Sequence, residues 1–134
     1  MLQGYKVLNL ESNQFKPVKA TLSKGKLSLN NALFQAIGFP FYYRLLFNKD
    51  LKRIVVEACE PLDEAAIKGI KNGQSYKIFT NQQLITLLSK WIPGYNHDKV
   101  YNLPVTVYDK FCLIDVSEAT YSRALYKGAE KDVR

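Results

Sequence analysis

Apolar and polar positions alternate in some stretches of this chain and follow helical spacing in others. Between residues 15 and 22 the apolar side chains recur at every second position, which predicts a strand with one buried face. The next segment, SKGKLSLNNALFQAIGF (23–39), opens with a turn and continues as a short amphipathic helix. Asn30 is the expected N-cap of this helix, and Gly38 suits the left-handed residue beyond its last turn.

A β-hairpin is predicted after this helix. Two β-rich runs, 41–47 and 53–59, are separated by the polar residues 48–50. A helical pattern then begins after the hairpin and stops at Gly73. We therefore expect residues 61–73 to form a helical linker.

The second half of the chain repeats this order of elements. Thr80 and Gln83 match the T-x-x-Q capping box, and the apolar residues after them keep helical spacing until Pro93. A second hairpin is predicted from the β-rich runs 100–107 and 111–116.

These elements predict a single compact α+β domain over residues 1–134, built from two strand–helix–hairpin units. The first unit spans about residues 15–60 and the second about residues 76–116, with the linker between them. The remaining residues, 117–134, form a tail that is expected to begin as a helix and to fray. The alternative is a common α+β order that occurs twice by chance.

Charge adds a functional expectation to this picture. The 134 residues, of which 47% are hydrophobic, can bury the core of one domain. The formal net charge is +7, and residues 1–57 carry +6 of it. A basic face therefore belongs to the N-terminal half, and a polyanion such as nucleic acid is the favoured partner.

The sequence gives no indication of a membrane segment, a metal site or a cofactor. No apolar run approaches the roughly 18 residues that span a bilayer, and the first residues lack the pattern of a signal peptide, so a cytoplasmic protein is expected. Cys59 and Cys112 have neither metal-ligand nor redox spacing, and both lie in apolar runs typical of core positions.

An enzyme is not expected. His97 is the single histidine, and it lies in the turn-rich segment GYNHDK, where a solvated side chain is favoured over a catalytic base. Asp63 and Glu64 are adjacent at the start of the predicted linker helix, where acids complement the helix dipole. No nucleophile elbow, P-loop, zinc-protease or dinucleotide-binding motif is present.

The segment LSKGKLSLNNALFQAIGF, followed by a hairpin ending in RIVVEACEP, resembles the AbrB and SpoVT type of swapped-hairpin DNA-binding domain over about residues 19–61. The resemblance implies that two such units interleave their hairpins into one barrel-like body. Two units in one chain would make an intrachain pseudo-dimer, so we expect either a monomer with internal pseudo-symmetry or a homodimer. The helix of this chain lacks the basic residues that the family usually carries there.

The resemblance also implies that basic loops and strand ends face double-stranded DNA. Arg44 and Arg53 are the sharper candidates, because a guanidinium group can make two parallel hydrogen bonds to a base or a phosphate. The full predicted set of nucleic-acid-binding residues is Lys19, Lys24, Lys26, Arg44, Lys49, Lys52 and Arg53. We therefore predict a small basic transcriptional regulator of a prokaryote, a phage or another mobile element.

Two other functions are compatible with the same pattern. One is a phage or mobile-element module that binds and modulates a host protein through the uncharged first helix or the tyrosine-rich hairpins. The other is a single-stranded nucleic-acid binder that stacks bases on exposed tyrosines. Filling of sheet positions is the structural alternative for the tyrosines.

Overall fold

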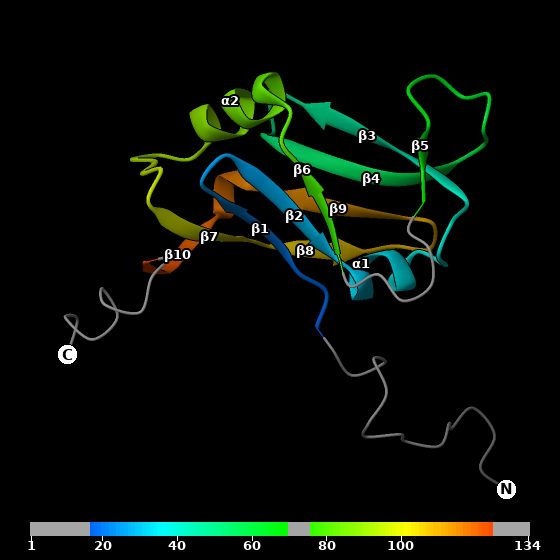
Figure 1. Ribbon diagram of the computed structural model, residues 1–134, viewed down its shortest axis with the longest axis horizontal. Helices are drawn as coiled ribbons and strands as arrows, with labels where there is room; N and C mark the ends of the chain where they lie inside the picture. The colour runs from blue at the N-terminus through cyan, green and yellow to red at the C-terminus, as the bar shows by residue number, and fades with distance from the viewer. Residues whose placement is uncertain (1–16, 70–75, 125–134) are drawn as a thin grey trace, which may run out of the picture.

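The fold is described from a computed structural model, which describes residues 17–69 and 76–124 (Figure 1). These residues form two five-stranded antiparallel sheets and two α-helices, so the α+β class is confirmed. The closed barrel and the swapped hairpins implied by the family resemblance are not seen in this part of the chain, because each sheet ends in edge strands and the hairpins pair within the chain as neighbours.

The first sheet, sheet A, has the strand order β10-β7-β1-β2-β6. In chain order its strands are β1 (Ala20–Ser23), β2 (Lys26–Asn30), β6 (Tyr76–Phe79), β7 (Lys99–Leu103) and β10 (Thr120–Ala124). The second sheet, sheet B, has the order β5-β3-β4-β9-β8. Its strands are β3 (Tyr42–Asn48), β4 (Arg53–Cys59), β5 (Ile67–Lys68), β8 (Val105–Val107) and β9 (Phe111–Asp115).

The turn between β1 and β2 follows directly from the sequence. Lys24 and Gly25 have φ values of 41° and 75°, which is the pattern of a two-residue type I′ turn. Such a turn matches the right-handed twist of the flanking strands. The predicted turn at residues 23–25 is therefore confirmed, and it holds the lysines on either side of Gly25 at the tip of the hairpin.

Helix α1 (Asn31–Ala36) has the ends that the sequence predicts. The side chain of Asn30 accepts a hydrogen bond from the Leu33 N–H at 3.1 Å, which makes it the N-cap. Gly38 has a φ of 89°, and the N–H groups of Gly38 and Phe39 bond back to the last turn in a Schellman arrangement.

Helix α2 (Gln82–Trp91) begins one residue later than predicted. Asn81, not Thr80, is the N-cap, and its side chain accepts from the Leu84 N–H at 3.1 Å. The predicted capping box of Thr80 and Gln83 is therefore wrong. With Asn81 as the N-cap, the third helical position is Leu84 and not Gln83, so no glutamine stands where a capping box requires it.

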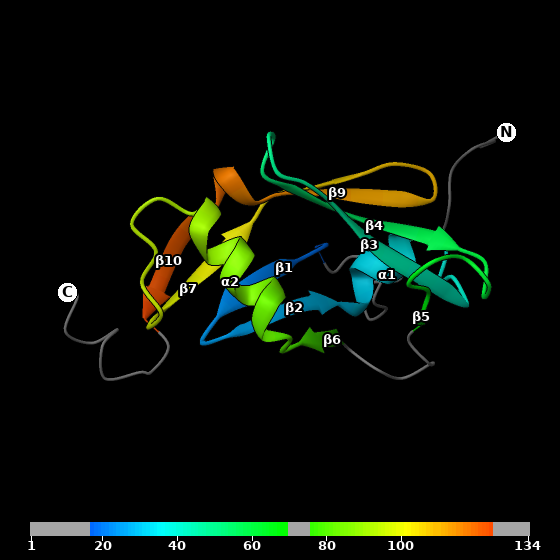
Figure 2. The ribbon, with the colours of Figure 1, turned by 90° about the horizontal axis from the view of Figure 1, so that it is seen from above.

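One hydrophobic core lies between the sheets and is closed by both helices. Its members from the sheets come from the inward positions of β1, β2, β3, β4, β7 and β9, and Leu33, Phe34, Leu88 and Trp91 are among those that join them from α1 and α2. Figures 1 and 2 show the two helices toward opposite ends of the molecule. The described residues thus share one core, and the faces at α1 and α2 are separate surfaces.

Three predicted elements differ in the structure. The predicted linker helix is wrong over residues 61–69, which form turns and the short strand β5; residues 70–73 lie outside the described part. The predicted hairpin strand 100–107 is divided at Pro104, since β7 belongs to sheet A and β8 to sheet B. Proline offers no N–H to a ladder, so a change of sheet is favoured at this point.

The predicted helix at the start of the tail is also wrong. A single 3₁₀ turn, Val116–Glu118, leads into β10, which pairs with β7 at the edge of sheet A. Tertiary pairing thus overrides a weak helical pattern. The end of the tail, 125–134, lies outside the described residues.

Candidate functional site

Four of the seven predicted binding residues lie in two hairpin turns. Lys24 and Lys26 flank Gly25 in the β1–β2 turn, and Lys49 and Lys52 lie in the β3–β4 turn. All four side chains are exposed, and none forms an ion pair with another described residue. Their charges are therefore available to a polyanion.

The backbone of the β3–β4 turn is held in place by hydrogen bonds. Asn48 Oδ1 accepts a hydrogen bond from the Leu51 N–H at 3.0 Å, and Lys52 adopts a left-handed φ of 56°. The carbonyl oxygen of Lys52 accepts from the Val116 N–H at 3.1 Å. The lysines of this turn thus project from a fixed backbone.

Helix α2 lies between the two basic turns, as the two ribbon views show (Figures 1 and 2). Its exposed side chains are Gln82, Gln83, Thr86 and Lys90, and the helix carries no acidic residue. We call α2 together with the β1–β2 and β3–β4 turns the α2 surface. Asp50 lies within this surface, between Lys49 and Lys52 in the β3–β4 turn, and offsets part of the charge of that turn. Asp98 is exposed in the loop that follows α2.

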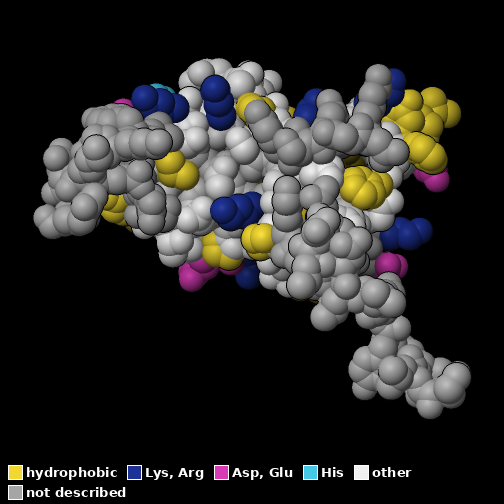
Figure 3. Space-filling view, turned by 60° about the horizontal axis from the view of Figure 1, so that its bottom comes forward, with side chains coloured by type: hydrophobic (Ala, Val, Ile, Leu, Met, Phe, Trp, Pro, Cys, Tyr) yellow, Lys and Arg dark blue, Asp and Glu magenta, His cyan; other side chains and the backbone are white. Residues whose placement is uncertain are grey.

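The face turned away from α2 has a different distribution of charge. In Figure 3, which brings that side forward, Lys and Arg side chains are scattered among acidic, apolar and uncharged groups. Among the described residues that this view exposes, no continuous basic area is visible. The α2 surface is therefore the better candidate for a polyanion.

The other three predicted residues are not part of the α2 surface. Lys19 precedes β1 at the end opposite the β1–β2 turn, and its backbone N–H donates to Asn30 Oδ1 at 3.0 Å. Arg44 Nε donates to Glu57 Oε1 at 2.9 Å, and Arg53 Nε lies 3.6 Å from Asp115 Oδ2. The positive charge of each arginine is thus offset by a neighbouring carboxylate.

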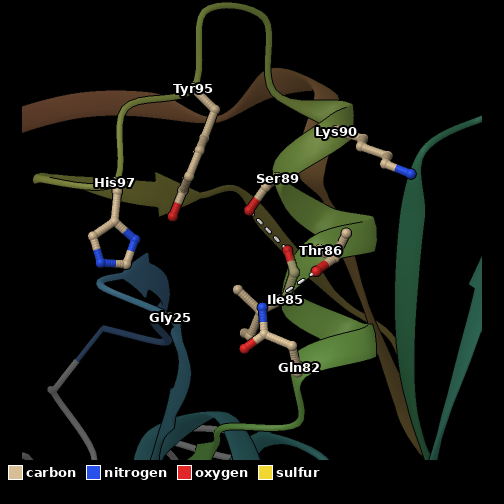
Figure 4. Close-up of a pocket in the computed structure, with 8 residues that line it drawn as sticks. All are labelled: Gly25, Gln82, Ile85, Thr86, Ser89, Lys90, Tyr95 and His97. Carbon is tan, nitrogen blue, oxygen red and sulfur yellow. Dashed lines mark hydrogen bonds between the residues drawn. The ribbon is translucent and has the colours of Figure 1, made fainter.

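A polar pocket opens beside α2, between the helix, the β1–β2 turn and the loop that follows the helix (Figure 4). Its volume is about 330 Å³, near the lower end of the ~300–1,000 Å³ typical of small-molecule sites. The pocket is lined by Gly25, Gln82, Ile85, Thr86, Ser89, Lys90, Tyr95 and His97. Sequence reasoning missed this site because the loop residues appeared to be solvated.

The wall of this pocket formed by residues 95–97 is fixed by packing on β7. Tyr95 stacks on Tyr101 with ring centroids 5.3 Å apart, and the Asn96 N–H donates to the Tyr101 hydroxyl at 2.8 Å. His97 lies over the β1–β2 turn, where a Cβ on Gly25 would come within 4.0 Å of His97 Cε1. The pocket is therefore bounded by elements from both halves of the chain.

A second cavity, of about 710 Å³, lies between the start of β3, the end of β4 and the segment after it. Phe41 lines this cavity and is 90% exposed, and the nearby Leu62 is 98% exposed. Lys110 and Asp63 add charge of both signs to the lining. Phe41 and Leu62 are thus the two most exposed large apolar side chains among the described residues.

The aromatic residues and the thiols are mainly structural. Tyr43 and Tyr101 are buried, Tyr108 stacks on Phe111 with ring centroids 4.7 Å apart, and no row of exposed tyrosines forms among the described residues. Burial raises the pKa of the Cys112 thiol to about 12, and burial also raises the pKa of Cys59. Neither thiol is therefore activated as a nucleophile.

Comparisons with known proteins do not identify a family. No protein-family model, curated protein or solved structure matches this chain. Among the described residues no cluster of His, Cys, Asp and Glu could hold a metal ion, and no helix there is long and apolar enough to cross a membrane. The chemistry of the α2 surface is thus the basis for a functional proposal.

Proposed function

We propose that this protein binds double-stranded DNA through the α2 surface, as a small regulator of the kind expected from the sequence. The observation that supports this proposal is the position of four exposed lysines without described acidic partners, two on each side of a helix that carries no acid. The swapped-hairpin body is not seen, so the proposal rests on charge and geometry.

The exposed side chains of α2 complement the lysines chemically. The lysines neutralise phosphates and release counterions, which supplies affinity that does not depend on sequence. The amide groups of Gln82 and Gln83 can donate to phosphates or read base edges, as glutamine does at adenine. The α2 surface therefore combines groups for affinity with groups for discrimination.

Fluorescence anisotropy with labelled duplex DNA at several salt concentrations tests the proposal. If the four lysines each contact a phosphate, the logarithm of the binding constant falls with the logarithm of the salt concentration with a slope of about −3.6. The variant Lys24→Gln/Lys52→Gln removes one charge from each turn. We expect it to reduce the magnitude of this slope by about 2.

The matched control is Lys68→Gln/Lys110→Gln, which lowers the net charge equally. Both residues are exposed, and β5 and the β8–β9 turn lie at the end of the molecule away from α2 (Figure 1). The control should keep the slope of the unmodified protein. Equal losses in the two variants would mean that the net charge, and not the α2 surface, is responsible; an absence of binding at low salt would exclude the function.

A protein partner is the second candidate function. Phe41 and Leu62 are almost fully exposed beside the second cavity, and large apolar side chains in such positions are typical of contact surfaces. This area lies at the end of the molecule opposite α2. The two functions therefore use separate surfaces and can be tested separately.

The test of this second function is the double variant Phe41→Ser/Leu62→Ser. Because both side chains are exposed, we expect the free energy of unfolding to change little, while affinity for a protein partner from a host lysate falls. Duplex DNA affinity should not change. Unchanged capture of the same partner by this variant would contradict a contact at Phe41 and Leu62.

A further inference from the structure

The pocket beside α2 has the composition of a site for a flat, polar, uncharged ring. Its described lining residues include no carboxylate, and they supply an amide from Gln82, hydroxyl groups from Thr86 and Ser89, and the imidazole of His97. Ile85 provides an apolar floor. Figure 4 shows the side chains of His97 and Tyr95 facing α2 across the pocket.

Several of these polar groups have capacity for another hydrogen bond. Ser89 Oγ donates to the Ile85 carbonyl oxygen at 2.7 Å, so its lone pairs remain as acceptors. The Tyr95 hydroxyl is buried and makes no hydrogen bond with another described residue. Gln82 Nε2 reaches Thr86 Oγ1 only at 3.4 Å, and its amide is exposed. Ser89 and Gln82 can therefore accept from or donate to a ligand with polar groups around a ring, whereas the buried Tyr95 hydroxyl is not accessible to it.

Three lysines belong to the segments that form the pocket. Gly25 lines the pocket, and the two residues beside it in the chain are Lys24 and Lys26. Lys90 lines the pocket from α2, and its side chain extends away from His97 (Figure 4). A pocket lined mainly by uncharged polar groups, with lysines on the adjoining segments, matches a nucleotide, whose base is neutral and whose phosphate is negative.

We propose that this pocket receives one unpaired nucleotide, with its base between His97 and the polar face of α2. The imidazole ring stacks on the base, the Gln82 amide pairs with its edge, and the phosphate lies toward the lysines on the adjoining segments. The nucleotide belongs either to a nucleic-acid strand bound over the α2 surface, in which case this inference rests on the proposed function, or to a free nucleotide.

Three matched DNA duplexes test the strand-bound case by fluorescence anisotropy. One is fully paired, one carries a single bulged nucleotide, and one carries the same bulge without its base. Stacking of one base is expected to make the bulged duplex bind about fivefold to 100-fold more tightly than the baseless one. The variant His97→Ala should lose this preference while it keeps its affinity for the paired duplex. Gln82→Ala should also lose the preference, which is read as the ratio of its affinities for the bulged and the baseless duplex.

The control is Gln83→Ala, the neighbouring exposed glutamine that does not line the pocket. It should keep the preference for the bulged base. Since Gln82 and His97 are both exposed, their variants are expected to fold, and circular dichroism checks this. Calorimetric titration with adenosine 5′-monophosphate tests the free nucleotide, and binding that His97→Ala abolishes would support that source.

The proposal is overturned if the bulged and baseless duplexes bind equally and adenosine 5′-monophosphate does not bind. Loss of the preference in Gln83→Ala as well as in Gln82→Ala would also overturn it, because the pocket would then not be the site. Failure of the proposed function is distinguishable: no duplex would bind at low salt, while nucleotide binding in the pocket would remain measurable.

Discussion

Arg44 donates a hydrogen bond to Glu57 at 2.9 Å, directly across the β3–β4 pair. This bond is the main reason why the pKa of Arg44 is raised above its usual value. Arg53 has a similar partner in Asp115 on β9, at 3.6 Å. The outer face of sheet B is therefore nearly balanced in charge at both arginines, although they were the sharper DNA-contact candidates in the sequence.

The first prediction compares Arg44→Gln with Lys24→Gln. Each variant removes one positive charge, but Glu57 already offsets that of Arg44. We expect Lys24→Gln to reduce the magnitude of the salt slope of duplex binding by about 1 and Arg44→Gln to reduce it much less. The measurement is anisotropy at several salt concentrations.

A larger effect of Arg44→Gln than of Lys24→Gln would contradict this prediction. A larger loss of sequence discrimination in Arg44→Gln would support a direct arginine contact with a base, and it would place the DNA interface on sheet B. Lys52 lies at the α2 surface and next to Arg53 in the chain, so the variant Lys52→Gln alone cannot distinguish the two surfaces.

The second prediction concerns the hydroxyl of Tyr43, which is fully buried and lacks a hydrogen-bond partner among the described residues. Its ring packs edge-to-face on Phe34 with centroids 4.9 Å apart, a contact that phenylalanine would keep. Tyr43→Phe should therefore raise the free energy of unfolding by about 1 kcal/mol. Urea unfolding measures this change.

Tyr101→Phe is the matched comparison, since the Tyr101 hydroxyl accepts a hydrogen bond from the Asn96 N–H at 2.8 Å. Its loss leaves a backbone donor without its partner, and we expect a decrease of about 1 kcal/mol. A stabilising Tyr101→Phe, or a destabilising Tyr43→Phe, would contradict this account of the two hydroxyl groups.

The third prediction concerns alkaline pH. Burial raises the pKa of Tyr43 from 10.0 and that of Cys112 from 9.0, each to about 12. Above pH 9 the unfolded chain releases these protons while the folded chain retains them, so stability is fully present below pH 9 and is lost as the pH rises toward 12. Urea unfolding at pH 8, 9, 10 and 11 measures this loss.

The double variant Tyr43→Phe/Cys112→Ala separates these two groups from the other titrating residues. We expect its stability to fall less steeply between pH 9 and 11 than that of the unmodified protein. An equally steep fall would assign the alkaline loss to the remaining tyrosines and lysines.

The parts of the fold that could be predicted are those that local sequence determines. Asn30, Gly38 and the Lys24-Gly25 turn each act through their own backbone neighbourhood, and the structure has them where the pattern indicates. The change of sheet at Pro104 depends on which distant strands pair. Pro104 indicates that the ladder is interrupted there, but no local pattern shows which sheet each of the two pieces joins.

In the candidate site, too, local sequence indicates single elements but not how they are brought together. The polar spacing of Gln82, Thr86 and Lys90 could indicate the exposed side of a helix, but not that two basic turns lie beside it. Likewise, His97 lies in a turn-rich segment that reads as solvated, and only the packing of Tyr95 on Tyr101 makes this segment the wall of a pocket. Sites assembled from separate segments require the tertiary structure.

The last prediction compares the two helix caps. Asn81 accepts one hydrogen bond, from the Leu84 N–H, whereas the side chain of Asn30 also accepts from the Lys19 N–H at 3.0 Å and donates to the Pro17 carbonyl at 2.8 Å. Asn81→Ala should cost about 1 kcal/mol of stability, and Asn30→Ala should cost about 2 kcal/mol or more, because it also detaches the segment before β1.

Substitution by aspartate at each position separates the contribution of the capping bond from that of the bond to Pro17, and urea unfolding measures both. Asn30→Asp keeps both accepted bonds but loses the donor to Pro17, so we expect it to recover part of the loss, whereas Asn81→Asp should recover nearly all of it. Equal costs for the two alanine variants would show that the bonds from Asn30 to Pro17 and Lys19 add nothing to the cap. In that case the anchoring of the chain before β1 would rest on the packing of Val18 against the core and on the hydrogen bond from the Asn30 N–H to the Lys19 carbonyl oxygen at 3.1 Å.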